Sequence, residues 1–129
     1  MATEWEALGS AIYSRLSSAG TIPVYQDVAV QGGTPPYIVF QRLPSFNEYV
    51  FGTKRFINSR YIVKAVSNRR TGNEAQRIYG PYKTAMQDAP LSVTGYGELR
   101  CRADISLHYQ DNDTFWHSGD EYLIDVHTE

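Results

Sequence analysis

The residues best suited to chemistry lie near the C-terminus, in the stretch HYQDNDTFWHSGDEYLIDVH from His108 to His127. It contains all three histidines of the chain, His108, His117 and His127, together with five acidic residues. Histidine nitrogens and carboxylates are ligands of zinc, and a histidine beside a carboxylate can act as a general base. The stretch therefore suggests either a metal or catalytic site, or the closing hairpin of a sheet.

The elements that would position these residues are two antiparallel strands. Apolar and polar side chains alternate along ELRCRADISLHY, which predicts a strand with one buried and one polar face. A second strand is expected from Thr114 to about His127, after the turn QDND. The residues expected on the buried face of the first strand are Leu99, Cys101, Ala103, Ile105, Leu107 and Tyr109.

The length of the connecting loop decides which side chains meet. An even loop needs no bulge, puts Tyr109 and Trp116 on the buried face, and places His108 opposite His117 on the polar face. An odd loop would turn Phe115 and His117 inward and would need a bulge near Gly119. We favour the even loop because it requires fewer adjustments.

Even in the favoured register the histidines do not complete a metal site. A zinc ion needs three or four ligands within about 2 Å, and the neighbours of His108 and His117 on that face, Ser106, Gln110, Phe115 and Gly119, are poor zinc ligands. Cys101 is expected on an apolar face, where a thiol is usually inert. We therefore predict no metal site and no catalytic residues. An enzyme or small-molecule binder that uses His108 and His117 is the less favoured alternative.

Four arginines are the best candidates for binding an anion. They are Arg55, Arg60, Arg69 and Arg70, in the segments KRFINSR and NRRTG. A cluster this small is more typical of a solvated face or of ion-pair partners. No lysine and hydroxyl residue follow the glycines of GGTPP into a helix, so no phosphate-binding loop is predicted.

Composition limits the class of protein. With 129 residues, 42% hydrophobic and 20% charged, the sequence predicts one globular domain spanning 1–129. A net charge of -2 provides no basic footprint for nucleic acid or an acidic membrane surface. No apolar run approaches the length of a membrane span.

The spacing of apolar residues and the positions of proline predict the remaining helices and strands. Trp5, Leu8, Ile12 and Leu16 share one face of an N-terminal helix. Pro23 indicates that IPVYQDVAV is an edge strand or irregular. Tyr37 to Phe40 is a continuous apolar run, which predicts a strand buried on both sides. The strand FINSRYIVKAVSN has two mostly apolar faces, which predicts a central strand covered on both sides.

A second helix is expected over TGNEAQRIYGPYKTAMQDAP. Thr71 and Glu74 form a capping-box pattern at its start, and Gly80 with Pro81 predicts a kink or short break. The order of helix, strands, helix and strands predicts an α+β fold. We expect an antiparallel or mixed sheet with both helices packed on it and a long C-terminal hairpin.

The segment at about 44–55 is expected to form a projecting arm. It carries Phe46, Tyr49, Val50 and Phe51, more apolar surface than a connection usually exposes. The arm either folds back on its own core or packs on another subunit. For the second case the predicted contact residues are Phe46, Tyr49, Val50, Phe51, Arg55 and Arg60.

The order of several segments resembles one family over nearly the whole chain. These are EALGSAIYSRL, IPVYQD, TPPYIVFQR, RYIVKAVSN, GNEAQRIYGPYKTAMQDAPLSV and the final LRCRADISLHYQDNDTFWHSGDEYLIDVH. Together they resemble the small tail-terminator, or tail-completion, proteins of long-tailed bacteriophages. Each motif alone is weak, and the Gly80-Pro81 pair departs from the pattern within the second helix.

The resemblance implies a structural protein of the virion, with no enzymatic activity and no cofactor. Members form a hexameric ring that caps the head-proximal end of the tail tube, ends polymerisation of the tube protein and presents a surface to the head-neck or connector proteins. DNA passes through the ring without sequence recognition, and assembly takes place in the host cytoplasm. Another ring component of the neck is the alternative, because one fold can serve several positions in a virion.

Overall fold

A mixed sheet flanked by helices forms the protein. The computed structural model describes residues 4–27, 35–50, 54–87, 90–91, 99–111 and 114–127. Within these ranges only the backbone is described for 4–5, 44–50, 54–58, 90–91, 99–100 and 125–127. The elements, in chain order, are α1 (Glu4–Ala19), β1 (Val24–Gln26), β2 (Tyr37–Val50), β3 (Lys54–Ser67), α2 (Asn73–Met86), β4 (Pro90–Leu91), β5 (Leu99–Gln110) and β6 (Trp116–His127).

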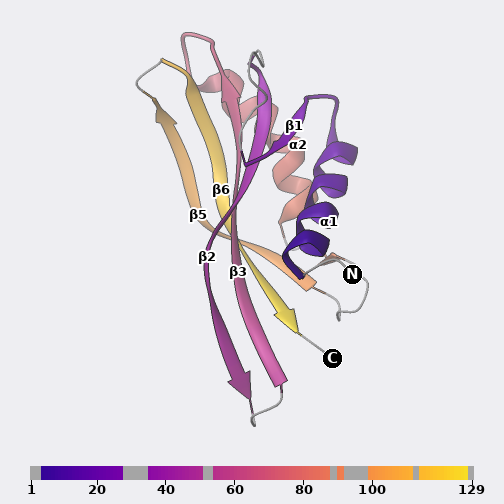
Figure 1. The fold of residues 1–129 in the computed structure, drawn as a ribbon. Helices are drawn as coiled ribbons and strands as arrows, with labels where there is room; N and C mark the ends of the chain where they lie inside the picture. The colour runs from indigo at the N-terminus through magenta and orange to yellow at the C-terminus, as the bar shows by residue number, and fades with distance from the viewer. Residues whose placement is uncertain are drawn as a thin grey trace.

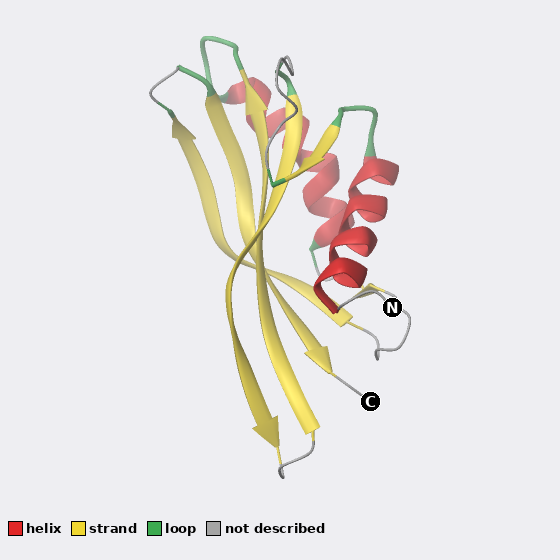
Figure 2. Cartoon of the chain, in the orientation of Figure 1, coloured by secondary structure: helices red, strands yellow, loops and turns green. Residues whose placement is uncertain are grey.

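The sheet has the strand order β1-β2-β3-β6-β5-β4. The short strand β1 pairs in parallel with β2 at one edge, and all other neighbours are antiparallel. The predicted α+β fold with a mixed sheet is thus confirmed, and the segment after Pro23 is an edge strand as expected. Both helices lie on the same side of the sheet (Figures 1 and 2).

The core lies between the helices and the covered face of the sheet. Leu8, Ile12 and Leu16 of α1 are buried, which confirms the helical spacing read from the sequence. They pack with apolar and aromatic side chains of the sheet and α2, among them Ile38, Phe40, Tyr61, Val63, Ala65, Tyr79, Tyr82, Met86, Cys101, Tyr122 and Ile124. Burial of apolar area on this scale is the main force that holds helices on a sheet.

Strand β3 is central, between β2 and β6, but only one of its faces is covered in this chain. Tyr61, Val63 and Ala65 are buried against the helices. Arg60, Ile62 and Lys64 point to the opposite side and are only half-buried. The prediction of cover on both sides is therefore wrong for the single chain, because both helices of the described part lie on one face. We call the uncovered side the open face.

The predicted register of the C-terminal hairpin holds from the Cys101–Ile124 pair to the Ala103–Tyr122 pair, but it is wrong by one residue from Ile105 to the turn. Gln110 pairs with Trp116, which leaves residues 111–115, an odd number, as the connection. The ladder shifts between Ala103 and Ile105, where Asp104 is an extra residue in β5. The bulge lies at Asp104 rather than near Gly119, and it reverses the alternation beyond it. Ile105, Leu107 and Tyr109 consequently lie on the open face instead of the buried one.

Helix α2 differs from its predicted form at both unusual points. Gly72 occupies the N-cap position without a side-chain capping hydrogen bond, so the expected Thr71–Glu74 capping box is absent. Glu74 instead accepts hydrogen bonds from Ser67 Oγ at 2.8 Å and from Arg69 Nε at 2.7 Å. The helix continues through Pro81 from Asn73 to Met86, so of the two predicted outcomes, a kink or a short break, the break does not occur.

Strands β2 and β3 form a long hairpin over the segment predicted as an arm. Phe46 pairs with Asn58, Tyr49 with Arg55 and Val50 with Lys54. The ladder shifts between Leu43 and Phe46 before this end of the hairpin. In Figure 1 these ends of β2 and β3 extend beyond the helices.

Candidate functional site

The bulge separates the two histidines that suggested a site. His108 pairs with Ser118, and His117 pairs with Tyr109, so the two imidazoles occupy opposite faces of the sheet. The predicted contact between His108 and His117 is wrong. Among the residues that the structure describes, no group of three histidine, cysteine or acidic side chains is placed to hold a metal ion.

Each histidine instead belongs to a local packing arrangement. His108 stacks on Trp116 on the helix side, with ring centroids 5.1 Å apart. A Cβ on Gly72 would lie 2.4 Å from His108 Nε2, so a larger residue in this loop before α2 would force the exposed imidazole to shift.

On the open face, His117 and Tyr109 stack in parallel at 4.8 Å. His117 Nε2 lies 2.6 Å from Asp111 Oδ2, and Lys64 Nζ donates to the Tyr109 hydroxyl at 3.1 Å. His117 Nδ1 is buried without a hydrogen-bond partner. These contacts join the turn, β5, β6 and β3, and they leave the His117 side chain only 12% exposed.

A buried polar cluster occupies the interface between α2 and the sheet. Tyr79 donates a hydrogen bond to Asp120 Oδ2 at 2.7 Å, and Ser106 Oγ donates to Asp120 Oδ1 at 2.6 Å. Since the Tyr79 proton is used in this bond, Tyr122, whose hydroxyl is 2.5 Å away, donates to the Tyr79 oxygen. Lys83 Nζ lies 3.6 Å from Asp120 Oδ2 and supplies a positive charge at the edge of the cluster.

Burial governs the ionisation of the tyrosines in this cluster. Burial, followed by the neighbouring Tyr122 and Asp120, raises the pKa of Tyr79 far above its usual value. Burial is also the main reason that the pKa of Tyr122 is raised. Both hydroxyls therefore remain protonated donors, which suits a structural cluster better than proton transfer near neutral pH.

Asp120 was not singled out as a core residue by the sequence. It lies in a polar segment, SGDE, that is typical of a turn, and its principal partner Tyr79 is far away in the chain. One signal was available in the sequence: Asp120 is two and four residues from Tyr122 and Ile124, so in a strand it points to the same buried face as they do.

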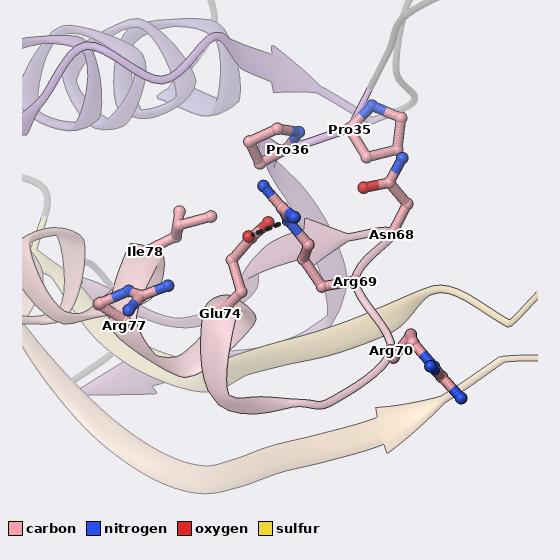
Figure 3. Close-up of a pocket in the computed structure, with 8 residues that line it drawn as sticks. All are labelled: Pro35, Pro36, Asn68, Arg69, Arg70, Glu74, Arg77 and Ile78. Carbon is pink, nitrogen blue, oxygen red and sulfur yellow. Dashed lines mark hydrogen bonds and ion pairs between the residues drawn. The ribbon is translucent and has the colours of Figure 1, made fainter.

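A hollow at the start of α2 brings together two of the predicted anion-binding arginines. It has a volume of about 730 Å³ and is lined by Pro35, Pro36, Asn68, Arg69, Arg70, Glu74, Arg77 and Ile78 (Figure 3). Arg69 and Arg70 belong to the loop after β3, as the sequence suggested. Arg77 was missed, although it follows Glu74 by three residues and therefore lies on the same side of the helix.

The other two predicted arginines are elsewhere. Arg60 lies on the open face and forms an ion pair with Asp104 at 2.9 Å. Arg55 belongs to the hairpin of β2 and β3, and its side chain is outside the described part of the structure. The structure thus divides the four arginines among three places.

The predicted interface residues are only partly described. Phe46, Tyr49 and Val50 have a described backbone in β2, without side chains, and Phe51 lies outside the described residues. Arg60 lies on the open face, where it bonds Asp104, the residue before Ile105; on this face Ile105 is 46% exposed and Tyr109 is 40% exposed. An exposed apolar surface of this kind is typical of a contact between proteins.

Comparison with known proteins adds information about the fold. No family model matches the sequence, and no curated protein matches it. One solved chain, from the virion of a native gene transfer agent particle, is 14% identical, covers 94% of this chain and 95% of its own length, and has a TM-score of 0.75. A second solved structure is 17% identical, covers 97% and 96% of the two chains, and has a TM-score of 0.69.

These similarities establish that the fold is shared over almost the entire length of each chain. At such low identity they concern the fold alone. None of the described helices has the length and hydropathy required to cross a bilayer.

Proposed function

We propose that the protein is a structural component of a phage virion, a ring that caps the head-proximal end of the tail tube. In this role it ends polymerisation of the tube protein and provides the surface to which the head-neck or connector proteins attach. The observation that carries the proposal is the fold similarity to a chain of a phage-like virion particle, with 94% of this chain and 95% of that chain covered. The order of sequence motifs independently favours the tail-terminator family.

The open face and the β2–β3 hairpin are the proposed contact surfaces. Subunits of a closed ring meet through two different and complementary patches. The uncovered side of the sheet offers Ile105, Tyr109 and Arg60, and the hairpin offers the apolar residues near Phe46 and Tyr49. A hexamer is the ring size that the family resemblance favours.

The proposed role involves no enzymatic chemistry and no cofactor. DNA would pass through the ring without specific binding, and the net charge of -2 supports this because a mildly acidic chain does not hold a polyanion. The protein would be assembled in the host cytoplasm and remain in the virion. The alternative of a site formed by His108 and His117 loses its support, since these residues lie on opposite faces of the sheet.

Imaging tests the proposal directly. Purified protein, alone or with tail tubes, should form rings visible by negative-stain electron microscopy. A phage that lacks the gene should produce overlong or headless tails. Tails of normal length that fail only to join heads would instead assign the protein to another ring of the neck. A strict monomer that does not cap tubes would contradict the ring proposal.

A further inference from the structure

We propose that the hollow at the start of α2 binds an acidic segment of a partner protein, in which a carboxylate stands beside an aliphatic side chain. The hollow lies where the loop after β3, the first turns of α2 and the entrance to β2 meet (Figure 3). The inference stands on the residues of this hollow and does not depend on the ring role.

The charges favour an anion. Glu74, the acidic residue of the lining, is already engaged at both oxygens, by Ser67 Oγ at 2.8 Å and by Arg69 Nε at 2.7 Å. Only one edge of the Arg69 guanidinium is used in this bond, and Arg69 is 72% exposed, so its terminal nitrogens can reach a ligand. Arg77 has no ion-pair partner within the described part of the chain. The ion pair of Arg69 and Glu74 is neutral as a whole, so Arg77 gives this part of the hollow a net positive charge.

The walls favour a peptide over a nucleic acid. Pro35, Pro36 and Ile78 line the hollow with apolar surface. A DNA backbone presents only small sugar methylenes between its phosphates, and it usually requires a row of cations. In Figure 3 the Arg70 side chain points away from Arg69 and Arg77, so no such row is formed. An aspartate or glutamate next to a leucine-like side chain matches both the cationic and the apolar parts.

The loop that carries Arg69 is fixed before any ligand arrives. The Arg69 backbone N–H donates to Ser67 Oγ at 3.2 Å, and Ser67 is fully buried. Trp116 Nε1 donates to the Arg70 carbonyl at 3.3 Å, which anchors the loop to β6. A preorganised site loses less conformational entropy on binding, so a short ligand can be recognised.

The test is a nuclear magnetic resonance titration of the full ¹⁵N-labelled chain. The probe is a blocked peptide that alternates leucine with aspartate, and the matched peptide replaces aspartate with asparagine. The acidic peptide should shift the guanidinium signals of Arg69 and Arg77, with the terminal nitrogens as the readout for Arg69, because its Nε–H already bonds Glu74. The neutral peptide, inorganic phosphate and a short DNA duplex should leave these signals unchanged at the same concentration.

Three variants assign the binding to the hollow. Arg77→Gln and Arg69→Gln should each weaken the acidic peptide about tenfold or more, the loss expected for a charge-assisted hydrogen bond. Arg102→Gln, at an exposed position of β5, is the matched control and should bind as the original chain does. Thermal unfolding by circular dichroism verifies that each variant is folded.

Several outcomes would overturn the inference. One is a failure of the acidic peptide to shift the two arginine signals at millimolar concentration. Others are equal affinity in all three variants, or equal binding of the neutral peptide. A shift caused by the DNA duplex in place of the peptide would reassign the hollow to a nucleic-acid backbone.

Discussion

Asp120 places a carboxylate in the core, where it is 1% exposed and depends on its hydrogen-bond donors. A buried carboxylate without such donors is costly, because the protein interior solvates charge poorly. Tyr79, Ser106 and Lys83 together compensate for the loss of water. At the scale of the residue, this cluster is therefore the most sensitive part of the interface between α2 and the sheet.

Replacing Tyr79 with Phe tests the cluster with little change in volume. The variant leaves Asp120 without one donor, and we expect the free energy of unfolding to fall by about 1–3 kcal/mol. Tyr13→Phe is the matched control, since Tyr13 is 47% exposed, and it should change stability by less than about 0.5 kcal/mol. Urea unfolding followed by circular dichroism measures both. Equal stability of the two variants would contradict a structural role for the Tyr79 hydroxyl.

Tyr61 and Cys101 are buried groups that can lose a proton in alkali. Their burial predicts that the folded protein becomes less stable at high pH. Burial raises the pKa of Tyr61 from 10.0 to about 12, although Arg42 lowers it in part, and raises the pKa of Cys101 from 9.0 to about 12. Both groups hold their protons more tightly in the folded chain. Their contribution is complete below about pH 9 and is lost as the pH rises toward 12.

Unfolding experiments at about pH 8 to 11 measure this effect. The free energy of unfolding should decline with pH, and Tyr61→Phe should make the decline shallower. A thiol reagent should label Cys101 only after unfolding, because the thiol is fully buried and protonated. Rapid labelling of the folded chain at neutral pH would contradict the predicted burial.

At the scale of the element, two glycines differ in whether the structure leaves space for a side chain. A Cβ on Gly119 would lie 2.0 Å from the Val63 carbonyl oxygen and 2.6 Å from Lys64 Cα, so β6 can approach β3 only without a side chain there. Apart from its two chain neighbours and the backbone of its own helix, a Cβ on Gly80 would meet nothing within 4 Å on the exposed surface of α2. Their alanine variants therefore form a matched pair.

Gly119→Ala should destabilise the protein by about 3 kcal/mol or more, because backbone must shift to relieve the contact. Gly80→Ala should stabilise it by roughly 0.5–1 kcal/mol, since alanine loses less conformational entropy than glycine in a helix. Thermal unfolding distinguishes the two signs. A lower melting temperature for Gly80→Ala would show that the backbone before Pro81 needs the freedom of glycine.

Helices and strands with a regular spacing of apolar residues, or bounded by a proline, were predictable from the sequence. The face formed by Leu8, Ile12 and Leu16, the edge strand after Pro23 and the central position of β3 all follow from local patterns. The bulge at Asp104 was not predictable. Apolar and polar residues alternate regularly along the whole of ELRCRADISLHY, so nothing in its sequence indicates an extra residue.

The sites depend on contacts between distant segments. Arg69 and Arg70 were recognised by their charge, whereas the role of Arg77 depends on how α2 lies against the loop after β3. The bond between Tyr79 and Asp120 likewise joins α2 to β6. Single-sequence patterns contain no information on such pairs, so the cluster and the full hollow emerge only from the tertiary structure.

At the scale of the whole molecule, the open face should mediate assembly if the ring proposal is correct. Ile105 is 46% exposed on this face, so Ile105→Asn should leave the monomer folded and impair ring formation. Ser17→Asn, at an exposed position of α1, is the matched control. Light scattering after size-exclusion chromatography, with negative-stain imaging, measures assembly. Rings formed equally by both variants would exclude Ile105 from the subunit contact.

The bulge at Asp104 marks a position where the sheet tolerates the loss of one residue. Ala103 pairs with Tyr122 and Ile105 pairs with Glu121, so a protein that lacked residue 104 could retain every other strand partner. Only the Arg60–Asp104 ion pair and part of the bend in β5 would be lost (Figure 1). Natural relatives one residue shorter at this point could thus keep the same inward and outward side chains, and alignments should allow a gap there.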